Sequence, residues 1–305
     1  MISDFISYLR YELNHSVLTC EAYERDLRQF SEWLAPKDLN NPDFSSLTQS
    51  DVRAWLASIS RKNLTPRTIR RKAQSIRAFF RYLMKKGIIT SNPTTDLILP
   101  KLPKPLPDVI RHNEIEQVLD TLESVDEVED IKRFQELLIV ETLYTLGIRR
   151  AELIALNDAD ISPSAGEIKV TGKRSKQRIV PAPSALVSKI RQWQRIRDEE
   201  WHDLPSPRPL FVVNGKRISA AQVYYAVKKN LANINARKKS PHALRHSFAS
   251  SMLDGGADLN SVKEFLGHTS LATTQIYTHV SLAEIRKAYQ TAHPRANSAK
   301  ERNSR

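Results

Sequence analysis

Several side chains in the last third of this 305-residue chain have the right chemistry to act on a phosphate group. Residues 240–245 read Ser-Pro-His-Ala-Leu-Arg, residues 266–268 read Leu-Gly-His, and Tyr277 follows nine residues later. Ser and Pro are typical of the start of a helix, so we expect His242 in a first helical turn, where free N–H groups attract an anion. Arg245 is expected one turn further on the same face. The set suits phosphoryl transfer by a protein nucleophile with cationic clamps.

Two further motifs carry cations that suit a phosphate. A helix is predicted over about 130–146 and ends at Gly147, a favourable C-cap, so Arg149 lies just past its end. Arg suits bidentate phosphate contacts, and Glu152, three residues later, could orient it. The turn 172–176 reads Gly-Lys-Arg-Ser-Lys, and a lysine at this loop tip could enter a DNA groove. Taken singly, each motif is equally typical of an ordinary ion pair or a charged turn.

Neither a metal nor a nucleotide cofactor is expected. His242 and His246 have the spacing of zinc ligands on a helix, but no Cys or nearby acid completes a ligand set. No phosphate-binding glycine loop is present either. A metal-dependent nuclease that uses Asp158 and Asp160 is a rival hypothesis, although these acids are expected in a connector before the first strand.

Composition restricts the partner and the compartment. The formal net charge is +13 with an isoelectric point near 9.8, which favours a polyanion such as nucleic acid. The single Cys20 excludes an intramolecular disulfide and is typical of a reducing cytoplasm. No apolar run reaches the length of a membrane span, so we expect a cytoplasmic protein with no membrane partner.

The prolines divide the chain. Five of them fall within 93–107, which predicts an extended linker rather than a helix. Strands are expected over 166–172 and 177–181 as an antiparallel hairpin, and helical periodicity dominates elsewhere. The fold class is therefore mainly α with a small antiparallel β-sheet. We expect four parts: a helical DNA-binding domain over 1–92, the linker over 93–107, a catalytic α+β domain over 108–296, and a polar tail over 297–305.

The N-terminal part contains a dense run of positive charge. Between Arg53 and Lys86 there are eleven basic residues and no acidic residue. This density predicts a surface that follows the phosphates of DNA. The sequence does not select among the candidate contacts, which are Arg67, Arg70, Arg71 and Arg77.

Together, the motifs resemble those of the tyrosine recombinases, the phage-integrase family, and are closest to its Xer branch. The boxes occur in the family's order, and similarity extends to residues 18–27 and 293–296. The resemblance implies six catalytic residues: Arg149, Lys173, His242, Arg245, His268 and Tyr277. It also implies that Tyr277 is the nucleophile and that Glu152 supports Arg149. This chain departs from the pattern at Arg150-Ala151 and at Arg174-Ser175. The second departure leaves Lys176 as an alternative to Lys173, which the register favours.

The resemblance also implies a reaction and partners. Members form a two-domain clamp on double-stranded DNA and cut and rejoin strands through a 3′-phosphotyrosyl intermediate. They work as homo- or heterotetramers on two duplexes, and the Xer branch resolves chromosome dimers, often with a DNA translocase. The alternatives are the integrase or transposase of a mobile genetic element, and a catalytically silent architectural DNA-binding protein.

Overall fold

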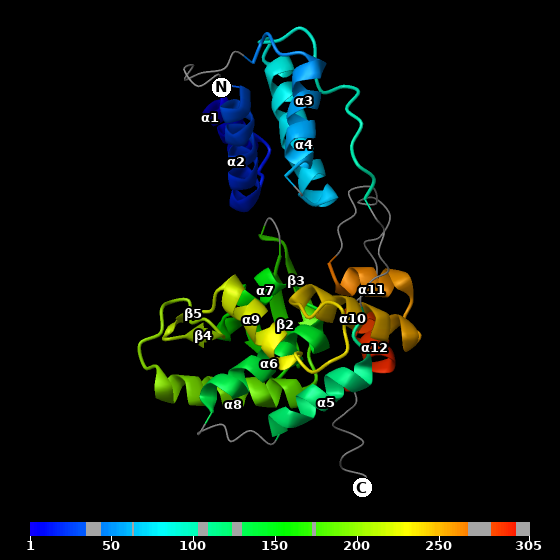
Figure 1. Ribbon diagram of the computed structural model, residues 1–305. Coiled ribbons are helices and arrows are strands. Elements are labelled where there is room, and N and C mark those ends of the chain that lie inside the picture. Colours follow the sequence, from blue (N-terminus) through cyan, green and yellow to red (C-terminus); the bar gives the residue numbers. More distant parts are fainter. Residues whose placement is uncertain are drawn as a thin grey trace. The chain divides into compact units, whose positions relative to one another are not determined.

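The computed structural model describes residues 1–34, 44–62, 64–102, 109–123, 130–172, 175–267 and 282–296. The chain divides into two compact units, Met1–Pro105 and Leu106–Arg305 (Figure 1). Both units are mostly helical and the second adds small antiparallel sheets, which confirms the predicted fold class. Within these described ranges, no helix is long and apolar enough to cross a membrane.

The N-terminal unit is a helical bundle with an aromatic core. Its elements are α1 (Ile2–Ser7), the π-helix η1 (Tyr8–Glu12), α2 (Val17–Leu34), α3 (Gln49–Ser60) and α4 (Pro66–Lys85). Capping sets two of the starts: the Thr48 N–H donates to Asp51 at 2.8 Å, and the Thr65 side chain accepts from the Thr68 N–H at 3.2 Å. The largest buried core residues are Trp55, Phe5, Phe30, Phe79 and Phe80.

The first half of the predicted linker packs on the N-terminal unit. Leu97 is 6% exposed and belongs to the core of this unit, and Thr94 is 2% exposed. Apolar burial therefore extends beyond residue 92, because prolines forbid a helix but do not prevent an extended segment from packing. The rest of the linker from residue 103, and the tail over 297–305, lie outside the described residues.

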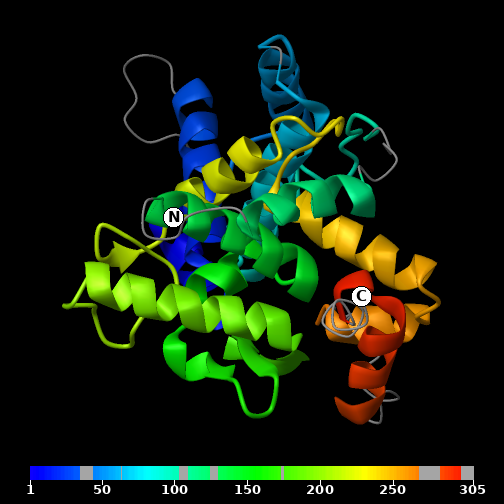
Figure 2. The same cartoon turned by 90° about the horizontal axis from the view of Figure 1, so that it is seen from below.

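The C-terminal unit is built around one central helix, α6 (Ile131–Leu146), whose residues from 134 to 146 are all buried. It contacts α5, α8, α9 and α10, and it lies in the middle of the unit in Figure 1. The surrounding helices are α5 (His112–Glu123), α7 (Arg150–Ala155), η2 (Asp158–Asp160), α8 (Ser184–Glu200), α9 (Ala220–Asn230), α10 (Pro241–Asp254), α11 (Leu259–Phe265), α12 (Leu282–Ala292) and η4 (Pro294–Ala296). In Figure 2, α8 is the long yellow-green helix along one side.

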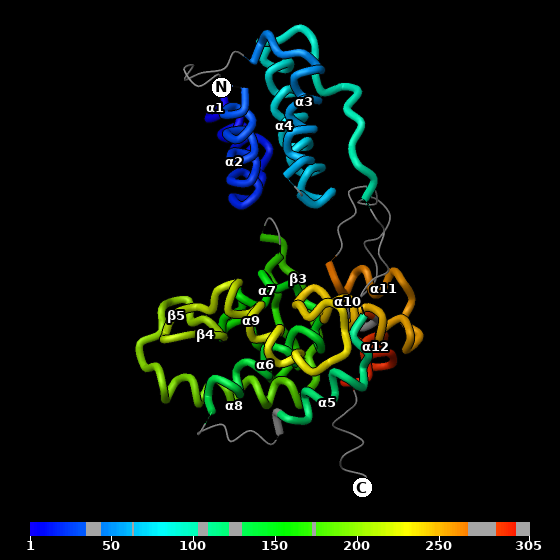
Figure 3. The backbone as a smooth tube through the Cα atoms, in the orientation of Figure 1, coloured from blue at the N-terminus to red at the C-terminus, as the bar shows by residue number. Residues whose placement is uncertain are grey.

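The predicted hairpin is present. Strands β2 (Glu167–Thr171) and β3 (Gln177–Pro181) pair antiparallel, with Val170 opposite Arg178, and β1 (Ile161–Ser162) adds to the other edge of β2. A second, two-stranded sheet consists of β4 (Val212–Val213) and β5 (Lys216–Arg217). Figure 3 shows the path from β3 into α8. The sheet matters for the site because it holds Arg178, on β3, beside α7.

The end of α12 carries a buried histidine. His293 is 2% exposed, its ring stacks on Phe248 and Tyr289 with centroids 5.0 and 5.2 Å away, and its Nδ1 accepts the Arg295 N–H at 3.3 Å. Burial, together with the nearby charges of His112 and Arg295, lowers the pKa of His293 to about 3. The ring is therefore neutral in the folded protein.

This burial predicts acid sensitivity. Below a pH of about 6.5 the unfolded chain binds a proton at His293 and the folded chain does not, so the free energy of unfolding falls as the pH decreases. Between pH 7.5 and 5.0 the loss from this residue is about 2 kcal/mol. His293→Phe keeps a stacking ring and is expected to lack this part of the loss in urea titrations followed by circular dichroism. An equal loss in both proteins would contradict the assignment.

Candidate active site

Arg149 is positioned by the end of α6. Gly147 adopts the left-handed conformation at φ +56°, and a Cβ there would lie 2.4 Å from the Phe248 ring, so only glycine allows the chain to turn at this point. Arg149 follows as the N-cap of α7. Its backbone N–H and its Nη1 each donate to Glu152 at 2.7 Å, and its Nη2 donates to the Gly267 carbonyl at 3.2 Å. The predicted Arg149–Glu152 pair is thus present.

Arg245 lies on α10, which begins as predicted: the Ser240 side chain accepts from the Ala243 N–H at 3.2 Å and Pro241 is the first helical residue. Arg245 is 6% exposed. Its Nη1 donates to the Gly147 carbonyl at 2.6 Å, and its Nη2 donates to the Leu266 carbonyl at 2.7 Å. Burial, then the neighbouring charge of Arg149, lowers the pKa of Arg245 to about 10. The residue remains a cation at neutral pH.

His242 and Arg245, which we expected on the same face of the helix, differ in solvent exposure. Three residues turn an α-helix by about 300°, so the two side chains diverge by about 60°. As a result Arg245 points inward and His242 is exposed. The ring of His242 lies beside that of His246, one turn later, with the two Nε2 atoms 3.0 Å apart. Among the residues that the structure describes, no group of three or more His, Cys, Asp or Glu could hold a metal ion.

Glu152 is the shared acceptor of the site and is 2% exposed. Burial alone would raise its pKa, but hydrogen bonds from Arg178 and from the Arg149 backbone together outweigh burial and lower it. The Nη1 of Arg245 lies 3.9 Å from the same carboxylate. Three guanidinium groups therefore surround one carboxylate, and the surplus positive charge suits an anion such as a phosphodiester.

Sequence reasoning missed Arg178. This residue is on β3, 18% exposed, and its Nη1 and Nη2 donate to the two oxygens of Glu152 at 2.9 and 3.0 Å. The two residues are 26 positions apart, and the pairing depends on how the sheet packs beside α7. The available signal was weak: a long cation in a short strand that otherwise carries the apolar pair Ile179 and Val180.

Three predicted catalytic residues, Lys173, His268 and Tyr277, lie outside the described residues and stay predictions. The described chain does define where two of these segments begin. Gly172 closes the hairpin turn by donating its N–H to the Lys176 carbonyl at 2.8 Å, directly before Lys173. Gly267, whose carbonyl accepts from Arg149, directly precedes His268.

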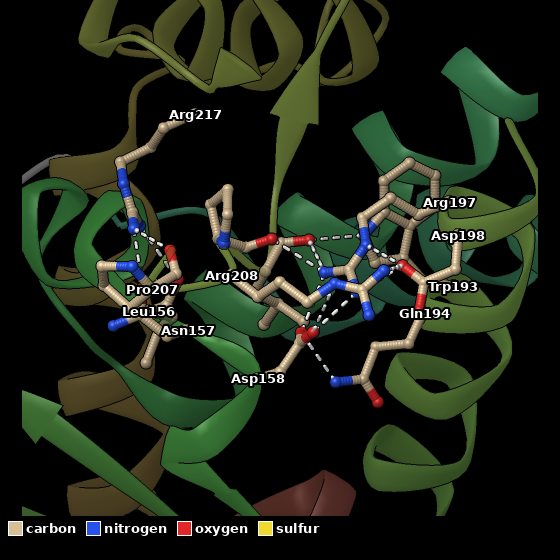
Figure 4. A network of polar contacts seen from close by, with 12 residues as sticks. Leu156, Asn157, Asp158, Trp193, Gln194, Arg197, Asp198, Pro207, Arg208 and Arg217 are labelled. Atoms are coloured by element: carbon tan, nitrogen blue, oxygen red, sulfur yellow. Dashed lines mark hydrogen bonds and ion pairs between the residues drawn. The ribbon is translucent and has the colours of Figure 1, made fainter. Parts of the chain in front are cut away.

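Asp158 and Asp160 have structural partners, which disfavours the metal-dependent nuclease. Figure 4 shows Asp158 facing the fully buried Arg197, whose Nη1 and Nη2 donate to its two oxygens at 2.8 and 2.7 Å. Asp160 accepts from the Asn157 N–H at 2.9 Å and lies 3.3 Å from the Lys169 ammonium. Both acids stabilise the connector between α7 and β1, where the sequence placed them.

Arg71, one of the four candidate DNA contacts in the N-terminal unit, has an internal partner. Its Nη1 donates to Asp26, a carboxylate on α2 with 0% exposure. The same carboxylate accepts from Lys72 at 3.1 Å and from Ser75 at 3.3 Å. A buried carboxylate needs such partners, so part of the positive run serves the α2–α4 contact rather than the surface.

The other three candidates differ in exposure. Arg77 is half-buried and its Nη2 donates to the Leu97 carbonyl at 2.8 Å. Arg70 is exposed, with its Nη1 3.2 Å from the Pro100 carbonyl, and Arg67 is exposed. Exposure therefore favours Arg67 and Arg70 as DNA contacts. The sequence could not distinguish the four, because a run of charge does not say which side chains have internal acceptors.

Comparison with known proteins identifies the family of this chain. Residues 108–284 match the model of the phage integrase family, and residues 2–87 match the phage integrase N-terminal SAM-like domain. Tyrosine recombinase XerC of Chlorobaculum parvum is 35% identical over 97% of this chain and 94% of its own length. Tyrosine recombinase XerC of Mycobacterium tuberculosis is 35% identical over 97% and 99%.

Solved structures agree at the level of the fold. XerH site-specific recombinase bound to palindromic difH substrate, in a post-cleavage complex, is 23% identical with a TM-score of 0.67, over 95% of this chain and 84% of that chain. The Tn1549 transposon integrase in complex with circular intermediate DNA is 21% identical with a TM-score of 0.67, over 94% and 98%. By its matched domains and its full-length relatives, the chain belongs to the phage integrase family and is a tyrosine recombinase.

Proposed function

We propose that this site-specific recombinase resolves chromosome dimers by exchanging strands between two DNA duplexes. The observation that carries the proposal is the convergence of Arg149 and Arg245 beside one buried carboxylate. Both arginines also donate to the carbonyls of Leu266 and Gly267, which directly precede the segment that contains His268 and Tyr277. The surplus positive charge suits a phosphodiester, and a phenol follows ten residues after Gly267. The full-length relatives named XerC favour this role over that of a mobile-element integrase.

In the proposed reaction, the phenolic oxygen of Tyr277 attacks a DNA phosphorus. A bond forms between phosphorus and Tyr277, and the bond to the 5′-oxygen breaks. Lys173 supplies the proton that the 5′-oxygen takes up, and His242 takes the proton of the phenol. One phosphodiester bond replaces another in this step, so the energy of the bond is stored in the protein–DNA linkage and no nucleotide is needed to drive the reaction. The 3′-phosphotyrosyl linkage is then open to attack by the 5′-hydroxyl of a second strand.

The cations act on the phosphate oxygens. Arg149 and Arg245 neutralise the non-bridging oxygens as negative charge develops, and His268 donates one further hydrogen bond. Arg149 is already held by Glu152 and the Gly267 carbonyl, and Arg245 by the Gly147 and Leu266 carbonyls, so little reorganisation is needed when DNA binds. The partners we propose are double-stranded DNA, three further recombinase protomers of the same or a related kind, and a DNA translocase, all in the cytoplasm.

The decisive experiment recovers DNA that is covalently attached to the protein in cells that express it. Sequencing that DNA gives the target site, and a chromosomal site near the terminus of replication would support dimer resolution. Digestion of the complex with trypsin should place the nucleotide adduct on the peptide 264–286, which contains Tyr277. Cleavage should persist in EDTA. Absence of any covalent complex, or an adduct on another peptide, would refute the mechanism.

A further inference from the structure

Three guanidinium groups hold three successive carbonyls at the end of α11. Arg178 donates through Nε to the Phe265 carbonyl at 3.1 Å, and Arg245 donates to the Leu266 carbonyl at 2.7 Å. Arg149 donates to the carbonyl of the next residue, Gly267, at 3.2 Å. The last carbonyls of a helix lack partners within the helix, so they are good acceptors. The two proposed phosphate ligands and Arg178 are thus tied to one short piece of backbone.

All three guanidinium nitrogens of Arg178 donate to internal acceptors. Its Nε binds the Phe265 carbonyl, and its Nη1 and Nη2 form a fork on the two oxygens of Glu152 at 2.9 and 3.0 Å. Gly267 makes room for this side chain: a Cβ there would lie 3.3 Å from both Cδ and Nη1 of Arg178. Three of its five N–H groups bind these internal acceptors, which suits Arg178 to hold other groups in place.

The contacts form a chain that leads to Arg149. Arg178 holds both oxygens of Glu152, and Glu152 in turn accepts from the backbone N–H and the Nη1 of Arg149, each at 2.7 Å. Arg149 is on α7 and Arg178 is on β3, so the carboxylate joins the two elements. A shift of Glu152 would move the guanidinium of Arg149, whose side chain is 41% exposed and available to an anion.

We infer that Arg178 is a positioning residue for strand cleavage: through Glu152 it orients Arg149, and through the Phe265 carbonyl it holds the end of α11. The inference rests on the proposed function. Only a planar guanidinium serves both acceptors at once, because an ammonium is a point donor that cannot reach a carboxylate fork and a separate carbonyl together. Charge alone at position 178 is therefore insufficient.

The test compares Arg178→Lys with the wild-type protein on a nicked duplex that carries the sequence recovered from covalent complexes in cells. We expect the single-turnover rate of covalent-complex formation at saturating DNA to fall about 10- to 100-fold, as for other residues that orient a ligand-binding group. The DNA concentration at half-saturation should change less than about 2-fold, because the proposed role of Arg178 is to hold Glu152 and the Phe265 carbonyl and not to bind DNA.

Arg197→Lys is the matched control. Arg197 is more deeply buried than Arg178, but it likewise forks onto one carboxylate and binds backbone carbonyl oxygen, and it lies in the separate network of Figure 4. Its substitution should lower the thermal midpoint and leave the cleavage rate of the folded protein unchanged. Equal rates for Arg178→Lys and Arg197→Lys, or a loss confined to DNA affinity, would overturn the inference.

A double-mutant cycle tests the route of action. If Arg178 acts through Glu152, then Arg178→Lys should reduce the rate by a smaller factor in a Glu152→Gln background than in the wild type. Independent, multiplicative effects would overturn that route. If Arg178→Lys does not fold, the double variant that carries Arg178→Gln and Glu152→Gln removes both charges together. A wild-type rate in that double variant would equally refute the inference. A wild-type protein that forms no covalent complex would instead refute the proposed function.

Discussion

Replacing Tyr277 by Phe is expected to abolish the covalent protein–DNA complex while duplex binding persists. The phenolic oxygen is the proposed nucleophile, and a phenyl ring of nearly the same size carries no atom that can attack phosphorus. We expect the rate to fall by at least about 10,000-fold, as for removal of other protein nucleophiles. The measurement is the fraction of nicked duplex that becomes attached to protein after denaturation.

Duplex binding is the control for this substitution. Electrophoretic mobility shifts should give similar affinities for both proteins, because the basic residues that contact phosphates are unchanged. Tyr289, which lies 12 residues later in the sequence, offers a matched variant: its hydroxyl donates to the Thr145 carbonyl at 3.1 Å and it is 2% exposed, so Tyr289→Phe should retain covalent-complex formation. Survival of the complex in Tyr277→Phe would show that another side chain attacks the phosphate.

Arg245→Lys is expected to reduce covalent-complex formation by about 1,000-fold. Arg245 is buried and divides its guanidinium between the Gly147 and Leu266 carbonyls, at 2.6 and 2.7 Å. A lysine ammonium cannot hold both carbonyls and also neutralise a developing charge on a phosphate oxygen. Losses of this size are typical when one preorganised donor to the transition state is removed. The rate should be measured at saturating DNA, in single turnover.

Stability must be separated from chemistry in this variant. Loss of one carbonyl contact in a buried site costs about 1–3 kcal/mol, so the thermal midpoint should also fall. Arg197→Lys again serves as the comparison, since it removes similar buried hydrogen bonds to backbone carbonyls, in a network that does not include Glu152. A proportionate loss of rate in both folded variants would mean that Arg245 only stabilises the fold.

Local signals in the sequence determined the elements and several of their ends. Gly147 ends α6 in the left-handed conformation, and Ser240 and Pro241 begin α10, as predicted. Each of these signals acts between residues at most about four apart, so it can be recognised without the fold. The order of the motifs was also sufficient to predict the family, which the domain matches confirm.

Only the tertiary structure decided how the charged residues pair. Arg178 reaches Glu152 across 26 positions, and Arg245 reaches Gly147 across 98, so neither contact has a local sequence signal. The positive run on α4 likewise did not reveal that Arg71 serves the buried Asp26. The sequence does not show which basic residues have internal acceptors. A buried carboxylate or carbonyl must accept a hydrogen bond, and the packing decides which donor lies near it. The sequence therefore determined which chemistry is possible, and the packing decided which residues hold the site in place.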